Sequence, residues 1–126
     1  MHPVNSRVIL RPGDRTRTTA FYRDTLGLAV AREFPGGTVF FCGQGYLEVS
    51  GEATEGPGET SLWFQVTDLA ATHRELLARG VTVDREPRCE PWGLHEMWLR
   101  DPDGVRIVVV QVPEEHPIRR DTRTPD

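Results

Sequence analysis

The chain carries one order of secondary structure twice, and this repeat constrains the fold more than any other feature of the sequence. Residues 7–50 predict a strand, a helix that begins near Asp14, and three further strands, because apolar alternation and glycine-containing turns follow one another in that order. After a polar linker at 51–60, residues 61–112 repeat the β-α-β-β-β order, with Asp68 as the helix cap. The sequence therefore predicts an α+β fold in which two βαβββ modules form a single domain.

The expected strands and helices set the boundaries of the two modules. The strands are predicted at residues 8–10, 28–34, 38–42, 46–50, 61–66, 81–84, 93–100 and 105–112. The first helix is predicted from Asp14 to about Gly27 and the second from Asp68 through Ala78. The domain spans residues 1–112, and the tail at 113–126 is rich in proline and charge, which predicts a flexible segment.

Composition and charge exclude several classes of function. The chain has 126 residues and a formal net charge of -4, without the basic patch that nucleic-acid-binding proteins carry. No apolar run approaches the roughly 18 residues of a membrane span, and the N-terminus lacks a signal-peptide pattern, so we expect a cytoplasmic protein. Cys42 and Cys89 have neither CxxC spacing nor a neighbouring histidine and are predicted to be reduced structural thiols.

Strand parity separates the side chains into two faces, because alternate residues of a strand point to opposite sides of a sheet. One set is apolar throughout and is expected to pack on the helices: Val8, Leu10, Leu47, Val49, Leu62, Phe64, Val66, Met97, Leu99, Ile107 and Val109. From the first helix, the residues expected on the same side are Ala20, Phe21, Leu26 and Leu28. The opposite set mixes aromatic, aliphatic, charged and amide side chains: Arg7, Ile9, Arg11, Tyr46, Glu48, Ser50, Ser61, Trp63, Gln65, Leu94, Glu96, Trp98, Arg106, Val108 and Val110.

This mixed face is typical of the lining of a ligand cavity. A sheet surface that faces only solvent does not need two tryptophans and a tyrosine, and a dry core does not tolerate unpaired arginine and glutamate side chains. Ligand pockets combine an apolar lining with a few polar anchors. Taken one at a time, each of these residues also fits a purely structural role.

Two stretches of the chain carry a resemblance to a known family. The segment FYRDTLGL in the first module and the segment PWGLHEMWLRDPDGVRIVVVQV near the end of the other module are similar to the vicinal oxygen chelate superfamily, which contains glyoxalase I, extradiol dioxygenases and the bleomycin resistance proteins. The likeness spans about residues 7–112 and includes the repeated β-α-β-β-β order. It implies a curled mixed sheet around a ligand cavity, with the helices on the outer face and a homodimer as the assembly.

The superfamily's enzymes hold a divalent metal with His and Glu ligands, and the resemblance assigns those positions here to Arg7, Glu48, Ser61 and Val108. Arginine stays protonated and valine has no donor atom, so only Glu48 keeps a ligand of the family's type. One carboxylate and a serine fall short of the three or four protein ligands of a typical site. We therefore expect no metal and no other cofactor.

Among superfamily members without a metal, the bleomycin resistance proteins are the most similar in detail. SLWFQV places Trp63, and EPWGLHE places Trp92, where those proteins carry tryptophans in the cleft, and Gln65 stands where a further tryptophan can occur. The DPDG segment at 101–104 is interpreted only as a turn. The candidate ligand-binding residues are Trp63, Trp92, Trp98, Tyr46, Glu48, Ser50, Gln65, Glu96, Phe40, Arg7 and Val108.

Two functions are consistent with this set of residues. The first is a binding protein that sequesters an aromatic antibiotic or natural product and gives resistance or self-protection. Its tryptophans would stack on rings and its glutamates would anchor amines or hydroxyls, while Arg7, Arg11 or Arg106 would pair with carboxylates. Alternatively, these charged side chains form ion pairs with one another and do not bind a ligand.

The second function is a lyase or isomerase in which Glu48 or Glu96 acts as a general base without the usual metal site. An enzyme that takes a metal ligand from its dimer partner is a third alternative. The sequence contains no Ser-His-Asp order, no activated cysteine and no phosphate loop, and this favours the binding protein.

Overall fold

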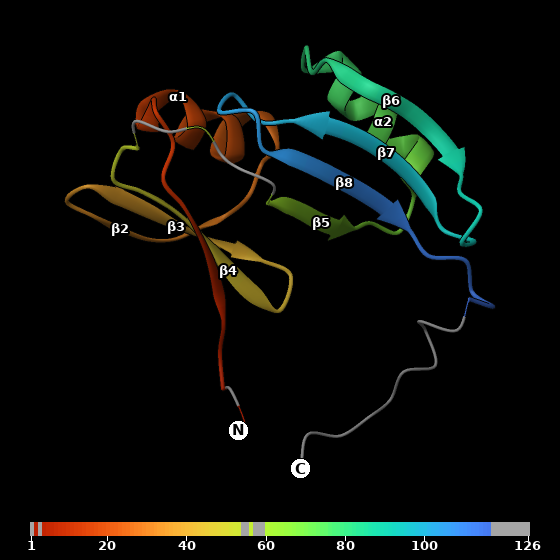
Figure 1. Ribbon diagram of the computed structural model, residues 1–126, viewed down its shortest axis with the longest axis horizontal. Coiled ribbons are helices and arrows are strands. Elements are labelled where there is room, and N and C mark those ends of the chain that lie inside the picture. Colours follow the sequence, from red (N-terminus) through yellow and green to blue (C-terminus); the bar gives the residue numbers. More distant parts are fainter. Residues whose placement is uncertain (1, 3, 54–55, 57–59, 117–126) are drawn as a thin grey trace. The chain divides into compact units, whose positions relative to one another are not determined.

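The computed structural model describes residues 2, 4–53, 56 and 60–116. Within these residues it contains two four-stranded mixed sheets and two α-helices, the first of which continues as a π-helical turn (Figure 1). The chain divides into two compact units. The first module holds β1 to β4 together with the turn Asp101–Val105, and the second module holds β5 to β8.

Both modules have the same order of elements. The first contains β1 (Arg7–Leu10), α1 (Arg15–Ala20), the π-helical turn η1 (Phe21–Thr25), β2 (Val30–Phe34), β3 (Gly37–Cys42) and β4 (Gly45–Ser50). The second contains β5 (Ser61–Gln65), α2 (Leu69–Ala78), β6 (Val83–Cys89), β7 (His95–Arg100) and β8 (Arg106–Gln111). The strand orders β1-β4-β3-β2 and β5-β8-β7-β6 correspond, with the first pair of each sheet parallel and the others antiparallel. The predicted α+β fold of βαβββ modules is confirmed.

Both helices begin at the predicted aspartates. Asp14 is the N-cap of α1, and its Oδ1 accepts a hydrogen bond of 3.0 Å from the backbone N–H of Arg17. Asp68 caps α2 in the same way, with Oδ1 3.0 Å from the N of Ala71. Each cap satisfies an N–H group that has no partner within the helix, which stabilises a helix by about 1 kcal/mol.

The core of the first module is built on Tyr22 rather than on the predicted helix residues. The side chains of Thr18 and Tyr22 are fully buried, whereas the predicted Ala20, Phe21, Leu26 and Leu28 are only half-buried. Thr18 and Tyr22 are four residues apart and so share one face of the helix, which is the buried one. The helix then continues as a π-helical turn, in which the N–H of Leu26 bonds to the carbonyl of Phe21 at 2.9 Å, five residues back.

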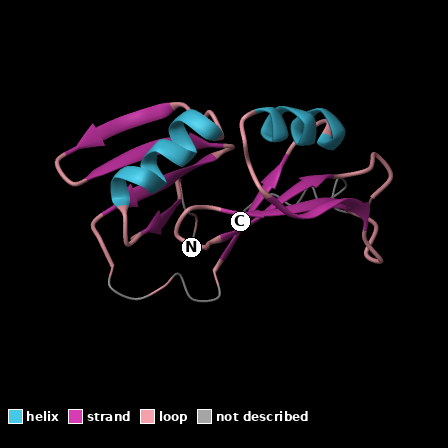
Figure 2. Cartoon of the chain, turned by 90° about the horizontal axis from the view of Figure 1, so that it is seen from above, coloured by secondary structure: helices cyan, strands magenta, loops and turns pink. Residues whose placement is uncertain are grey.

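The core of the second module follows the predicted apolar face. Figure 2 shows α2 as a layer on one face of its sheet, and no described helix covers the other face. Of the predicted apolar set, Leu62, Met97, Leu99, Ile107 and Val109 are buried and Phe64 and Val66 are half-buried, and α2 contributes buried Leu69 and Leu76. In the first module Leu10, Leu47 and Val49 are buried as predicted, but Val8 is 44% exposed on the edge strand β1.

The largest difference in strand boundaries is at β6. The sequence predicts a strand at residues 81–84, whereas β6 runs from Val83 to Cys89. The polar sequence around Pro87 indicates a loop, yet β6 is the edge strand of its sheet, where proline is tolerated. Its register against β7 shifts between Val83 and Arg85 and again between Arg85 and Arg88.

The predicted linker and tail are described only in part. Residues 54–55 and 57–59 of the linker and 117–126 of the tail lie outside the described residues. The first residues of the tail form a turn in which the N–H of His116 bonds to the carbonyl of Pro113 at 3.0 Å. No helix in the described part of the chain is long and apolar enough to cross a membrane.

Candidate functional site

Three predicted site residues form one polar cluster on the helix-free face of the first sheet. β1 and β4 are parallel neighbours, with Arg7 opposite Tyr46 and Ile9 opposite Glu48. Arg7 Nη1 lies 2.8 Å from Glu48 Oε1, and the Ser50 hydroxyl donates a hydrogen bond of 2.7 Å to Glu48 Oε2. Both oxygens of the Glu48 carboxylate therefore have partners within the module.

These partners change the chemistry of Glu48. The hydrogen bond from Ser50, the hydrogen bond from Arg7 and the positive charge of Arg7 hold the pKa of Glu48 below its ordinary value of 4.5. The carboxylate is thus kept ionised, and its lone pairs are directed at donors of its own module. A carboxylate in this state is a poor proton acceptor and offers little to a cation.

Aromatic side chains border this cluster. The guanidinium of Arg7 lies 5.7 Å from the centre of the Tyr46 ring, and the Phe41 ring lies 5.6 Å from the same ring. Phe41 is 51% exposed and was not among the predicted site residues. Phe40, which was predicted to bind ligand, is instead fully buried: it pairs with Leu47 in the strand register and contacts Tyr22 on the helix side. Because two phenylalanines are adjacent on β3, the sequence alone does not indicate which of them points to the core.

The second module presents a row of side chains across all four of its strands. In the strand register Trp63 on β5 pairs with Val108 on β8, Val108 pairs with Trp98 on β7, and Trp98 pairs with Arg85 on β6. Because neighbouring strands lie about 4.8 Å apart, the backbones that carry Trp63 and Trp98 are separated by roughly 10 Å. We call this helix-free surface the open face of the second module; it comprises Trp63, Gln65, Arg85, Glu96, Trp98, Arg106 and Val108.

A buried glutamate on this face holds Trp98 and also Trp92, which lies in the turn before β7. Glu96 is 5% exposed, and its Oε2 accepts a hydrogen bond of 2.6 Å from the indole N–H of Trp92. Its Oε1 accepts another of 3.1 Å from the indole N–H of Trp98. Glu96 therefore orients two indole rings, and neither of its oxygens is left without a donor.

Trp92 is also held by the tail. The His116 Nε2 lies 2.9 Å from the carbonyl oxygen of Trp92. The next residue, Gly93, has a φ of 88°, and a Cβ there would come within 3.1 Å of the His116 ring. The PWG sequence thus combines a backbone conformation that favours glycine with a close approach of the tail.

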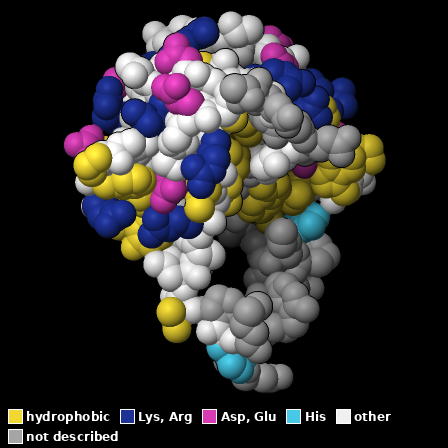
Figure 3. All heavy atoms as spheres, turned by 60° about the vertical axis from the view of Figure 1, so that its left-hand side comes forward, with side chains coloured by type: hydrophobic (Ala, Val, Ile, Leu, Met, Phe, Trp, Pro, Cys, Tyr) yellow, Lys and Arg dark blue, Asp and Glu magenta, His cyan; other side chains and the backbone are white. Residues whose placement is uncertain are grey.

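Arginine side chains cover the ring of Trp98. The guanidinium of Arg85 lies 3.4 Å from the centre of that ring and the guanidinium of Arg106 lies 4.7 Å from it. All 15 basic residues are arginines, because the sequence contains no lysine, so every dark-blue side chain in Figure 3 is an arginine. Planar guanidinium groups stack readily on aromatic faces. Trp98 was predicted to grip a ligand, but its ring already has these two contacts.

Buried Glu90 balances part of this positive charge. Its Oε1 forms an ion pair with Arg85 and another, 3.2 Å long, with Arg88. Glu96 lies 4.0 Å from Arg85. Arg85 and Glu90 were not predicted as site residues, since the segment that contains them was interpreted as a loop. The only signal in the sequence was the alternation of Arg and Glu before PWG.

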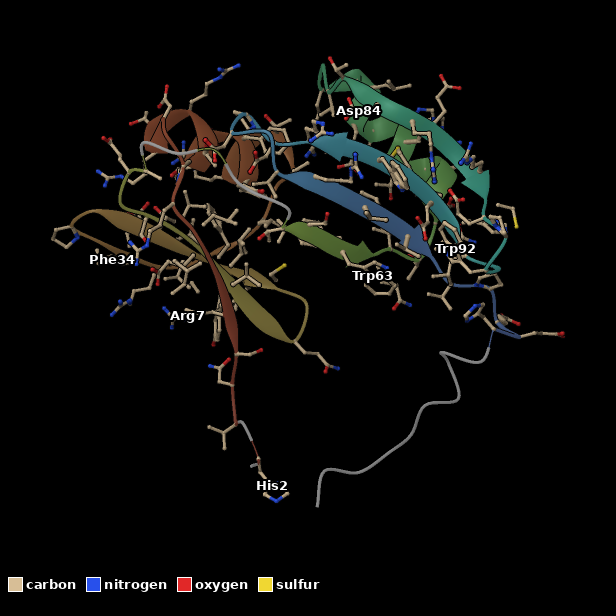
Figure 4. All side chains as sticks on the ribbon, in the orientation of Figure 1. His2, Arg7, Phe34, Trp63, Asp84 and Trp92 are labelled. Carbon is tan, nitrogen blue, oxygen red and sulfur yellow. The ribbon has the colours of Figure 1, made fainter. Side chains whose placement is uncertain are left out.

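The exposed aromatic surface belongs to the other two tryptophans. Trp63 is 46% exposed and Trp92 is 53% exposed; Figure 4 shows Trp63 on β5 and Trp92 at the end of the sheet where β7 begins. Leu94, Val110 and Val112 form a buried apolar cluster of the same module, and the half-buried Val108 packs against it. Gln65 is exposed beside Val110. The accessible part of this surface is therefore formed mainly by the two indole rings.

The DPDG segment does more than turn the chain. Asp101 is 5% exposed, and its Oδ1 accepts hydrogen bonds from the backbone N–H groups of Asp103 and Val105, as in a turn. Its Oδ2 accepts a bond of 2.7 Å from the hydroxyl of buried Tyr22. Sequence reasoning missed this pair because 79 residues separate the two side chains.

The fold and these faces define a known class of protein. The chain belongs to the glyoxalase/bleomycin resistance protein/dioxygenase superfamily, whose family model matches residues 5–109. The resemblance to this superfamily is therefore confirmed. The sequence has no match among curated proteins.

Several solved structures resemble the chain over most of its length. A glyoxalase/bleomycin resistance protein/dioxygenase from Nocardioides is 18% identical with a TM-score of 0.76, over 91% of this chain and 87% of that one. A lactoylglutathione lyase from Agrobacterium tumefaciens is 22% identical with a TM-score of 0.71, over 86% and 94%. A protein of unknown function from Agrobacterium tumefaciens str. C58 is 25% identical with a TM-score of 0.72, over 90% and 95%. The first two likenesses show the fold alone.

The residues present do not fit the divalent metal that the superfamily's enzymes hold. Arg7, at one of the expected ligand positions, places its guanidinium on the carboxylate of Glu48, at another. The other two positions are an exposed serine, Ser61, and Val108, which has no donor atom. Within the described residues, no group of three or more His, Cys, Asp or Glu side chains is placed to hold a metal ion.

Proposed function

We propose that this protein binds an aromatic antibiotic or natural product without a metal and sequesters it unchanged, giving resistance or self-protection. The observation that carries the proposal is the pair of half-exposed tryptophans of the second module, Trp63 on β5 and Trp92 in the turn before β7. Large exposed aromatic side chains that gather on one surface are typical of a binding site. This arrangement suits the activity of the bleomycin resistance proteins, the superfamily members that bind their antibiotic without modifying it.

The fixation of Trp92 supports this proposal. Its indole N–H is bonded to buried Glu96 and its carbonyl oxygen to His116, so the ring has little freedom to lose when a ligand binds. A side chain that is ordered before binding contributes more of its contact energy to affinity. Each aromatic stacking contact adds about 0.5–1.5 kcal/mol beyond the burial of area.

The alternative function, a lyase or isomerase with a glutamate as general base, has less support. A general base that works near neutral pH needs a raised pKa, whereas Ser50 and Arg7 lower the pKa of Glu48. Both oxygens of Glu96 accept indole N–H groups. Either glutamate would have to break these contacts before it could accept a proton from a substrate.

Tryptophan fluorescence provides the test. The protein is titrated with bleomycin, an anthraquinone and an enediyne chromophore, and the bound ligand is then extracted and identified by mass spectrometry. We expect saturable quenching by at least one of them and recovery of the ligand unchanged. Binding that survives dialysis against EDTA is expected, since no metal site takes part.

Variants locate the binding surface. Trp63→Ala and Trp92→Ala should each weaken binding about 10-fold, the effect of losing roughly 1.4 kcal/mol. Leu77→Ala is the matched control, because Leu77 is 51% exposed on α2, outside the open face. Failure of all three compounds to bind, or conversion of a ligand into product, would contradict the proposal. The homodimer implied by the resemblance stays a prediction, which analytical ultracentrifugation of the same sample tests.

A further inference from the structure

The charges on the open face of the second module do not balance. Arg85 and Arg88 form ion pairs with Glu90, and Arg85 also approaches Glu96 to 4.0 Å. Arg100, on β7, pairs with Asp84 at 2.9 Å. Arg106 lies on the same face, and among the described residues its guanidinium contacts the Trp98 ring at 4.7 Å rather than a carboxylate. One positive charge therefore lacks an anion within this part of the chain.

The crowding of guanidinium groups points in the same direction. Arg85 and Arg106 both lie against the ring of Trp98. Burial and the positive charges of Arg88 and Arg106 lower the pKa of Arg85, and Glu96 only partly opposes them. Like charges held this close repel each other in a partly buried setting, and an anion placed beside Arg106 would relieve the repulsion.

The neighbours of Arg106 suit an anion attached to a ring. Arg106 pairs in the strand register with Ser61 on β5, whose side chain is exposed. Two residues further along the same strands, Trp63 pairs with Val108. Since a strand rises about 3.3 Å per residue, the Arg106 row and the Trp63 row lie roughly 7 Å apart on one face. The guanidinium of Arg106 itself lies over the Trp98 ring on β7, in the row that also holds Val108 and Trp63, so it faces the Trp63 indole across Val108.

These distances select the size of the ligand. A carboxylate on Arg106 places a directly attached flat ring system over Val108, with its face or edge against Trp63. The contact with the face of the Trp98 indole uses none of the N–H groups of the Arg106 guanidinium. Two of these N–H groups can therefore donate to the two oxygens of a carboxylate.

We propose that the open face of the second module selects a planar aromatic carboxylate, with its anion on Arg106 and its ring on Val108 and Trp63. The proposal rests on the proposed function and narrows its ligand class from aromatic compounds in general to aromatic anions. A cationic aromatic compound would meet the unbalanced charge of Arg106 and bind more weakly.

The test compares a carboxylate with its neutral isostere. 2-Naphthoate and 2-naphthamide have the same ring system and nearly the same shape, and each is titrated into the full-length protein by fluorescence and calorimetry. We expect 2-naphthoate to bind at least about 10-fold more tightly than 2-naphthamide, because the amide cannot form the charge-assisted hydrogen bond. The difference in affinity should become smaller in high salt, which screens the charges. Arg106→Gln should abolish the preference, and Arg106→Lys should keep part of it.

The controls separate charge at this position from charge in general. Arg74→Gln removes an exposed arginine from α2 and should leave the preference unchanged. Circular dichroism determines whether each variant is folded. If Arg106→Gln is not folded, the comparison is made with Arg106→Lys. Equal binding of acid and amide, or a preference that persists in folded Arg106→Gln, would overturn this inference while the proposed function stands. If neither naphthyl compound nor any antibiotic binds, the proposed function itself falls.

Discussion

Arg7 and Glu48 form an ion pair across two parallel neighbouring strands, with 2.8 Å between Nη1 and Oε1. The pair occupies two positions at which the superfamily's enzymes hold a metal. Because a guanidinium cannot bind a cation and already engages the carboxylate, the sheet keeps the arrangement of the family site without its donor chemistry.

The first prediction concerns acid stability. The pKa of Glu48 is lower in the folded chain than its ordinary value of 4.5, so its stabilisation is fully present above that value and is lost as the pH falls through the lowered pKa. Glu48→Gln should therefore lower the free energy of unfolding near neutral pH and show a flatter decline in acid. Urea unfolding at a series of pH values measures this. Exposed Glu52→Gln is the control, and parallel profiles for wild type and Glu48→Gln would contradict the account.

The second prediction concerns the buried pair of Tyr22 and Asp101. Burial is the main cause that raises the pKa of both groups, and the tyrosine hydroxyl donates to the carboxylate at 2.7 Å. Tyr22→Phe leaves a buried carboxylate oxygen without its donor and should lower the free energy of unfolding by about 1.5–3 kcal/mol. Tyr46→Phe, at the other tyrosine, should change it by less than about 0.5 kcal/mol. Similar effects of the two variants in urea unfolding would show that the pair is unimportant.

The third prediction compares two adjacent phenylalanines. Phe40 is fully buried against Tyr22, whereas Phe41 is 51% exposed on the opposite side of β3. Phe40→Ala should lower the free energy of unfolding by about 3–5 kcal/mol, as expected for an aromatic side chain removed from a core. Phe41→Ala should have a much smaller effect. The reverse order in thermal or urea unfolding would mean that the parity assigned to β3 is wrong.

The fourth prediction concerns the support of Trp92. In Glu96→Gln one carboxylate oxygen becomes an NH2 group, which is a donor and cannot accept the indole N–H that this oxygen accepts, so one of the two hydrogen bonds is lost in this geometry. We expect more efficient quenching of tryptophan fluorescence by acrylamide and several-fold weaker binding of aromatic ligands. Glu86→Gln, at an exposed position on β6, serves as the control. Unchanged quenching in a folded Glu96→Gln variant would argue against this role.

Local signals predicted much of the fold. Asp14 and Asp68 cap the helices because their side chains satisfy N–H groups a few residues away, which sequence spacing reveals directly. The apolar alternation at Met97 and Leu99, and at Ile107 and Val109, likewise predicts the buried face of the second sheet. Features whose partners are near in sequence were therefore predicted correctly.

Contacts between distant residues were not predicted. Tyr22 lies in the π-helical turn, and its hydroxyl donates a hydrogen bond to Asp101. No local pattern in the sequence indicates that bond. Arg85 reaches Trp98 only because the polar segment around Pro87 forms an edge strand, which depends on pairing with β7. For the candidate site, strand parity placed Trp63 and Trp98 on the face opposite α2, but Phe40 was assigned to the wrong side of β3, and the ionic partners of the aromatic rings were not predicted.

Indole N–H resonances give the most direct test of the central claim, that the protein holds an aromatic ligand on its tryptophans and leaves it unchanged. The three tryptophans give three such signals in a 15N–1H spectrum, and the variants at positions 63 and 92 assign them. On addition of the tightest-binding aromatic compound, we expect the signals of Trp63 and Trp92 to shift saturably while the ligand's own spectrum shows no conversion. Absence of any shift at these two signals, or appearance of product at a rate that falls in Glu48→Gln, would contradict the account.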